Sequence, residues 1–216
     1  MISDLRVSLD QLLSMLASLN LDLWPAQFLG YALALAAAGL AGFRRPWASR
    51  AASGILAAMW LASALVYHLG YFSRLSELGY VFAALFGLQA ALLLWDGPLK
   101  ANLVLAPAGD GFMVMGALFM FWALAGHPWL SAYLGHPWPR LGLVGLAPGP
   151  TAAFTCGLLL WSRGRMPKRL LAIPALWSFL AFVLAVDLGL REEVPLLLVG
   201  LVSASLLLPR DLKPVI

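Results

Sequence analysis

Long apolar stretches alternate with short polar segments along nearly the whole chain. Each stretch is bounded by charged residues, glycine or proline, and most are close to the 20 or so apolar residues that a helix needs to cross a membrane. The stretches are residues 24–43, 51–71, 79–95, 111–126, 143–161, 170–189 and 194–208. This pattern predicts an all-α protein, a polytopic bundle of about seven transmembrane helices that forms one membrane domain over residues 1–216.

A different pattern precedes the first stretch. Leucines recur over residues 1–20 at spacings of about three, four and seven, as in an amphipathic helix, which we expect to lie in the membrane interface. Charged residues interrupt this segment, so we do not interpret it as a cleavable signal peptide. The leucines are Leu5, Leu12, Leu13, Leu16 and Leu19.

The composition agrees with a membrane protein. Hydrophobic residues make up 62% of the 216 residues and charged residues only 11%, against about 25% charged in soluble domains. We therefore expect a multi-pass protein of a cell membrane, such as the bacterial inner membrane, with the lipid bilayer as its main partner. No segment is long enough for a soluble catalytic domain. The net charge of +4 is typical of basic cytoplasmic loops, and we expect no nucleic-acid partner.

Lysine and arginine predict the orientation. If the N-terminus is outside, ten of the 14 basic residues fall on the inner side, so the positive-inside rule favours N-out and C-in. The inner residues are Arg44, Arg45, Arg50, Lys100, Arg163, Arg165, Lys168, Arg169, Arg210 and Lys213. The outer residues are Arg6, Arg74, Arg140 and Arg191.

The first three and last three stretches share an order of features. Gly87–Lys100 aligns with Gly200–Lys213 without gaps, and His68-Leu69-Gly70 falls opposite Asp187-Leu188-Gly189. These matches suggest two parallel repeats on either side of the fourth stretch, a 3+1+3 arrangement. Chance alignment of Leu- and Ala-rich segments is the alternative.

Two ionisable residues stand near the outer ends of predicted spans. His68 follows Tyr67, and an ionisable group at membrane depth usually faces protein or a water-filled cavity. His68 could bind a ligand, relay protons or ligate a metal; alternatively it is an interfacial residue hydrogen-bonded to a backbone carbonyl. Asp187 would pair with His68 if the repeat exists, or would be a loop carboxylate beside Arg191.

The sequence Gly-His-Pro-Trp occurs twice, at residues 126–129 and 135–138. Its prolines predict an ordered outer loop or a re-entrant turn rather than one helix. His127 and His136 are too few for a closed metal site, although His68 would make a three-histidine cluster. The single cysteine, Cys156, excludes a multi-thiolate site within one chain.

Pro148-Gly149-Pro150-Thr151 is the most unusual backbone feature. Two prolines without N–H groups and a permissive glycine should interrupt helical hydrogen bonding. Non-helical backbone at membrane depth must be buried in protein or line a cavity, as in the discontinuous helices of transporters. A kink, or a helix that begins at Pro150, is the alternative.

The amide side chains and the absence of catalytic motifs do not point to a specific activity. Gln27 is a candidate ligand-binding residue, although Gln27 and Gln89 could equally bridge helices. No phosphate-binding loop, zinc helix or nucleophile elbow is present, and the carboxylates are few and scattered. We therefore do not interpret the protein as an enzyme, and we expect no cofactor.

Several segments together resemble an uncharacterised bacterial family of polytopic membrane proteins with a domain of unknown function. The resemblance covers most of the chain and implies a membrane protein without implying an activity. The family commonly has a cysteine between the two prolines where this chain has Gly149, which argues against thiolate chemistry here. The segments are Trp24-Pro25-Ala26-Gln27, Tyr67-His68, Tyr71-Phe72-Ser73, Gly135–Pro139, Pro148–Thr151, and Lys168–Leu171 with Ile173-Pro174 and Trp177.

Three functions remain open from the sequence. The first is translocation or binding of a small solute or ion near His68, His136, Asp187 and the Pro148–Thr151 break, which requires an enclosed polar cavity. The second is an accessory subunit of a larger membrane complex, or a homo-oligomer, with apolar contact faces and no cavity. The third is a membrane protein that holds a metal or haem through its histidines.

Overall fold

A computed structural model describes residues 7–210, and the chain is almost entirely helical, which confirms the predicted class. The α-helices are α1 (Leu9–Asp22), α2 (Gln27–Gly42), α3 (Pro46–Ala62), α4 (Leu78–Leu94), α5 (Gly111–Phe121), α6 (His127–Tyr133), α7 (Pro148–Leu160), α8 (Arg169–Leu188) and α9 (Leu196–Leu207). Short π or 3-10 segments are η1 (Ser63–Tyr71), η2 (Phe72–Arg74), η3 (Trp95–Leu99), η4 (Trp122–Gly126) and η5 (Arg191–Glu193). Strands β1 (Val104–Leu105) and β2 (Ser162–Arg163) pair antiparallel.

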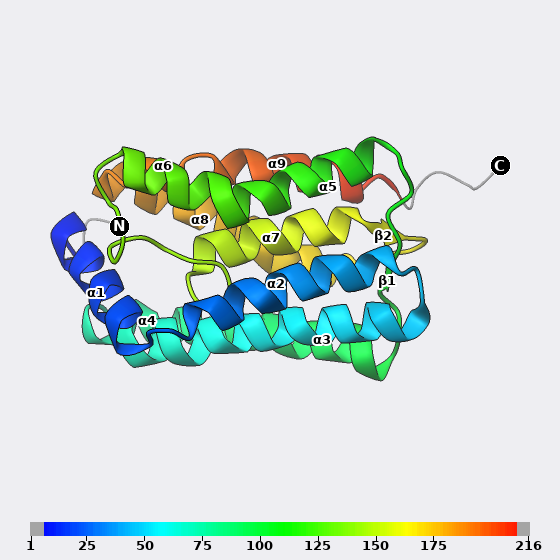
Figure 1. The fold of residues 1–216 in the computed structure, drawn as a ribbon, viewed down its shortest axis with the longest axis horizontal. Helices are drawn as coiled ribbons and strands as arrows, with labels where there is room; N and C mark the ends of the chain where they lie inside the picture. The colour runs from blue at the N-terminus through cyan, green and yellow to red at the C-terminus, as the bar shows by residue number, and fades with distance from the viewer. Residues whose placement is uncertain (1–6, 211–216) are drawn as a thin grey trace.

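Most helices run along one long axis, with α1 across one end of the bundle and the β1–β2 pair at the other (Figure 1). Four continuous helical segments of residues 7–210 are long and apolar enough to cross a membrane: Pro46–Arg74, Leu78–Leu99, Gly111–Tyr133 and Arg169–Leu188. A fifth would be α1 and α2 taken together, but these two helices meet at a bend of 87°. Helices α7 and α9 are shorter, with 13 and 12 residues.

Helix α7 is the centre of the bundle (Figure 1). Every residue from Pro148 to Leu160 is buried, and α7 contacts α2, α3, α5, α8 and α9. Glycines allow α7 and α5 to pack closely. A Cβ on Gly157 would lie only 2.6 Å from the carbonyl oxygen of Gly116 on α5, so a larger residue would not fit there. A helix enclosed on all sides has no amphipathic pattern, and none is visible in the α7 sequence.

Polar side chains inside the bundle connect neighbouring helices. Trp60 on α3 donates from Nε1 to Thr155 Oγ1 on α7 at 2.8 Å. Gln89 on α4 donates from Nε2 to the Leu170 carbonyl on α8 at 2.9 Å, so Gln89 bridges helices as expected. Large apolar side chains face outward instead, as shown by the exposed Phe28, Val114, Phe121, Val186 and Leu198.

The end that carries β1 and β2 contains one strong ion pair. Arg169, at the start of α8, donates from Nε to Asp96 Oδ2 at 2.7 Å and from Nη2 to Oδ1 at 2.6 Å. Asn102 also donates to Asp96 Oδ1, at 3.0 Å. The Asp96 side chain is fully buried, so this bidentate contact fixes α8 against the end of the α4–η3 segment.

The opposite end is built from α1 and the segment 134–147, which leaves α6 and enters the bundle before α7 begins. Asn20 on α1 is buried and donates from Nδ2 to the carbonyls of Pro139 at 2.7 Å and Leu141 at 2.8 Å. Gln27 donates to the Asn20 carbonyl at 2.7 Å. These bonds hold α1 over the entering segment, whose last part, residues 141–147, is buried except for the partly exposed Leu146.

Candidate functional site

A cavity of about 70 Å³ lies between α1, α8 and the start of α7, at the end of the bundle that carries α1. Its walls come mostly from apolar side chains, and its polar groups come from two histidines, one tyrosine, one tryptophan and two glutamates. A cavity needs about 10–15 Å³ to hold one water, so the space suits a solute of a few heavy atoms. The polar lining residues are Tyr67, His68, His127, Trp177, Glu192 and Glu193.

His68 forms one wall of this cavity and is only 1% exposed. It lies in the π-helical segment η1, a helix type that is frequent at functional sites. Aromatic rings surround it, with centroids at 4.5 Å for Phe86, 5.4 Å for Trp177 and 5.7 Å for Phe82. Within residues 7–210, neither ring nitrogen has a hydrogen-bond partner, and a buried polar group in that state is costly unless something else satisfies it.

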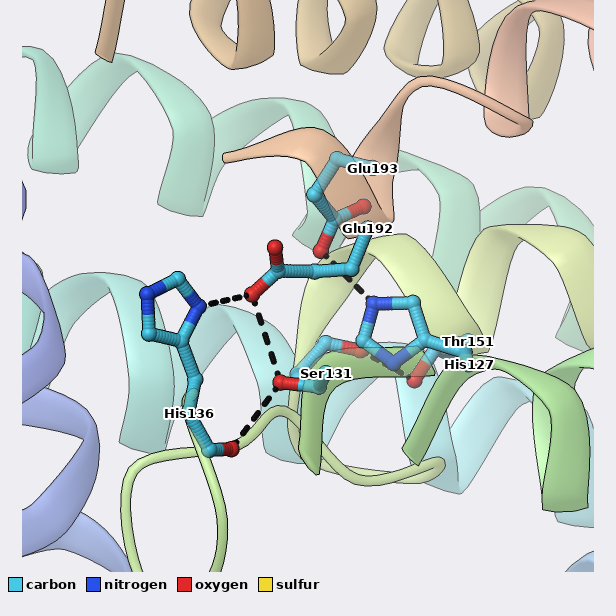
Figure 2. A network of polar contacts seen from close by, with 7 residues as sticks. His127, Ser131, His136, Thr151, Glu192 and Glu193 are labelled. Carbon is cyan, nitrogen blue, oxygen red and sulfur yellow. Dashed lines mark hydrogen bonds and ion pairs between the residues drawn. The ribbon is translucent and has the colours of Figure 1, made fainter. Parts of the chain in front are cut away.

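His127 and Glu193 form a second polar pair on the wall (Figure 2). His127 follows the π-helical segment η4, and its Nε2 lies 3.1 Å from Glu193 Oε1. Since an ionised carboxylate only accepts, Nε2 carries the hydrogen in this pair. His127 Nδ1 and Glu193 Oε2 are buried without a partner among the described side chains and backbone.

Glu192 lies between the cavity and a second pocket. Its Oε1 lies 2.8 Å from His136 Nδ1 and 3.2 Å from the Ser131 hydroxyl, which donates to it, as Figure 2 shows. The residue is 3% exposed, and it lines both the cavity and a second, outer pocket of about 210 Å³. The other residues of the outer pocket are Leu134, His136, Gly189 and Arg191. Glu192 therefore separates the two spaces.

The double-proline segment forms the start of α7, not a kink within a longer helix. Ala147 is extended and Pro148 is the first helical residue. The N–H of a first helical residue makes no hydrogen bond within the helix, so a proline is tolerated there. Thr151 Oγ1 donates to the Ala147 carbonyl at 2.7 Å and accepts from the Gly145 amide at 2.9 Å. The alternative start at Pro150 is wrong by two residues, and the break in the helix is enclosed by protein.

The structure brings together some of the predicted site residues and separates others. Tyr67, His68, His127, Pro148 and Gly149 all line the cavity. Pro150 and Thr151 are buried in the first turn of α7, and Gln27 holds α1 through the Asn20 carbonyl, so these three shape the site without lining it.

His136 and Asp187 do not meet His68. His136 lines the outer pocket, and Asp187 is exposed on α8. The expected His68–Asp187 pair is therefore wrong: the cavity face of α8 carries residues 177, 181, 184 and 188, and position 187 points away from this helical face. Within residues 7–210, no three His, Cys, Asp or Glu side chains are placed to hold a metal ion.

Glu192 and Glu193 are residues of the candidate site that the sequence did not predict. They are the two adjacent carboxylates in η5, directly before α9. They lie 56 and 66 residues away from their histidine partners. The description of the carboxylates as scattered was wrong, and the adjacent pair in a chain with only ten acidic residues was the available signal.

Comparison with known proteins gives a family but no activity. The model of a family of unknown function, DUF6064, matches residues 9–216, which confirms the resemblance to an uncharacterised family. None of the curated proteins and none of the solved structures compared with the chain matches it.

Proposed function

The chain belongs to DUF6064, a family of unknown function, and on that premise we propose that it is a multi-pass membrane protein that binds a small solute in the cavity beside His68. The bound solute is then either translocated or sensed. The observation that carries this proposal is His68 itself, a buried imidazole in a cavity wall whose two nitrogens have no partner among residues 7–210.

The distribution of side chains supports a bilayer as the solvent. Buried polar residues such as Ser53, Gln89 and Ser203 lie inside the bundle, while large apolar residues such as Phe121 and Leu198 lie on its surface. Helix packing through small and polar residues is typical of membrane bundles. We propose that seven segments cross the membrane of the cell, with α7 as a half-length central helix that is preceded by re-entering backbone.

The orientation that we propose places the α1 end outside and the β1–β2 end in the cytoplasm. Arg44, Arg45, Lys100 and Arg163 gather near the β1–β2 end, in agreement with the positive-inside rule. The cavity and the outer pocket then open toward the outer side, and Glu192 with His136 forms the boundary that a solute crosses.

The start of α7 supports a transport role over a purely structural one. In transporters, discontinuous helices often begin near the midplane, and the unwound backbone beside them lines the solute site. Pro148 and Gly149, the first two residues of α7, line the cavity here. The accessory-subunit alternative requires no such cavity.

Cysteine labelling tests whether a small molecule in the surrounding water can enter the cavity. In a Cys156→Ala background, Ala181→Cys places a thiol in the cavity wall, and Tyr133→Cys places one at the exposed end of α6. We expect a small neutral methanethiosulfonate, added to the protein in lipid nanodiscs, to modify the thiol of Ala181→Cys. It should also modify Leu184→Cys, a second variant with a thiol in the cavity wall. The proposal fails if neither cavity cysteine reacts although both variants remain folded and Tyr133→Cys shows that the reagent is active.

A further inference from the structure

We infer that the solute of this cavity is a small ammonium ion, either ammonium itself or a short alkylammonium such as methylammonium. This inference rests on the proposed function and names the chemical class that the site selects. It depends on the charge of the lining, on the balance of vacant donors and acceptors, and on the aromatic walls.

The charged groups that line the cavity are acidic. Glu192 and Glu193 both reach it, and no lysine or arginine is among the lining residues in the described part of the chain. Arg191 lines the outer pocket instead. Glu192 is 3% exposed, and a carboxylate removed from water needs a compensating charge or hydrogen bonds. Glu192 Oε1 is already paired with His136 and Ser131, but Glu192 Oε2 is buried without a partner among the described residues. A cation in the cavity would supply that partner.

The vacant hydrogen-bonding groups also favour a ligand rich in donors. Glu192 Oε2 and Glu193 Oε2 are unpartnered acceptors. Because His127 Nε2 donates to Glu193, the vacant His127 Nδ1 is a third acceptor in the neutral ring. Neutral His68 adds one acceptor and one donor, and Trp177 Nε1 adds one donor. The Tyr67 hydroxyl, which also lines the cavity, adds one acceptor and one donor. Among the lining side chains of residues 7–210, acceptors therefore outnumber donors five to three, and a primary ammonium brings three N–H donors.

The remaining walls suit a cation as well. Aromatic rings of Tyr67, Phe72, Phe82 and Trp177 line the space, and the negative face of such a ring attracts an ammonium group. The volume of about 70 Å³ admits a solute of a few heavy atoms, because a cavity holds one water in about 10–15 Å³. A small carboxylate of equal size would meet two like charges, and a neutral alcohol would offer only one donor to the vacant acceptors.

The test compares reagents that differ in charge. Cationic 2-aminoethyl and anionic 2-sulfonatoethyl methanethiosulfonate are applied to Ala181→Cys, and each rate is divided by the rate at Tyr133→Cys, which is 75% exposed. We expect the cationic reagent to be favoured at least about tenfold, because a carboxylate nearby attracts one reagent and repels the other. Glu193→Gln should reduce this preference, and the exposed Asp187→Asn should not change it.

Protection by an added solute gives the second measurement. Methylammonium chloride should slow the labelling of Ala181→Cys by the neutral reagent, and sodium acetate at the same concentration should not. Equal rates for the two charged reagents, or protection by acetate and not by methylammonium, overturn the ammonium inference while the binding cavity stands. Failure of all reagents at both Ala181→Cys and Leu184→Cys overturns the proposed function itself, so the two failures are distinguishable.

Discussion

Gly149 leaves the space that the Glu193 carboxylate occupies. A Cβ on residue 149 would lie 2.8 Å from Glu193 Oε1 and closer still to Oε2, whereas Cβ atoms in close-packed interiors keep ordinary van der Waals distances. The glycine between the two prolines therefore lets the carboxylate reach both the first turn of α7 and His127.

Gly149→Ala should affect the site more than the fold. The added methyl group displaces a flexible carboxylate and not backbone, and alanine is favoured over glycine in a helix by about 1 kcal/mol, so the Tm should change little. The cationic preference at Ala181→Cys should fall roughly fivefold, the effect of about 1 kcal/mol. Gly87→Ala is the matched control, because nothing lies within 4 Å of its added Cβ. An unchanged preference in Gly149→Ala would show that Glu193 does not act from this position.

Asn20→Ala should loosen the segment that enters the bundle. The substitution removes two hydrogen bonds to the carbonyls of Pro139 and Leu141, at an expected cost of about 1–3 kcal/mol in the free energy of unfolding. Hydrogen exchange should accelerate in residues 136–147 and not in α4. Ser18→Ala, on the exposed side of the same helix, is the control. Equal exchange in the two variants would contradict the role assigned to Asn20.

Asp96→Asn should destabilise the opposite end of the bundle without changing the cavity. Asparagine cannot accept both Arg169 bonds as a carboxylate does, and the Asp96 side chain is buried. We expect a clear fall in Tm, with the labelling preference at Ala181→Cys retained. Asp187→Asn, at an exposed carboxylate, should shift the Tm by no more than about 2 °C. A similar Tm for both variants would remove the structural role of the ion pair.

The proposed orientation predicts which end of the bundle is reached in intact cells. In the Cys156→Ala background, Tyr133→Cys on α6 should react with a membrane-impermeant maleimide added outside. Arg163→Cys in β2 should react only after the membrane is permeabilised, because the basic end is cytoplasmic. The opposite result would reverse the orientation, and reaction at both positions in sealed cells would argue against spanning.

The helical class follows from the sequence because apolar composition and length leave few alternatives. A chain that is 62% hydrophobic must satisfy its backbone within helices if its solvent is lipid. The break before α7 could also be read from the sequence, since Pro148 and Pro150 cannot continue a helix from the preceding residues. Its burial at the centre of the bundle depends on five contacting helices, which no local pattern reveals.

Only part of the candidate site could be predicted from the sequence, because the other part depends on contacts between distant residues. His68 and the Pro148–Gly149 pair were found because ionisable residues and helix breaks are rare in apolar segments. Glu192 and Glu193 were missed because charges in a short connection are usually solvated. Their partners His127 and His136 come from distant parts of the chain. Asp187 does not face His68, as an internal repeat would require, because helical rotation separates it from Leu184 and Leu188 on the cavity face of α8.

The most direct test of the account is the response of the three histidine rings to a bound solute. The chain has only His68, His127 and His136, so ¹⁵N-histidine NMR in nanodiscs can assign each ring by single substitution. Titration with methylammonium should shift the ring resonances of His68 and His127 in a saturable manner, and Glu193→Gln should weaken this response. If the His68 resonances stay unchanged up to saturating methylammonium, acetate and ethanol, the cavity does not bind a small solute.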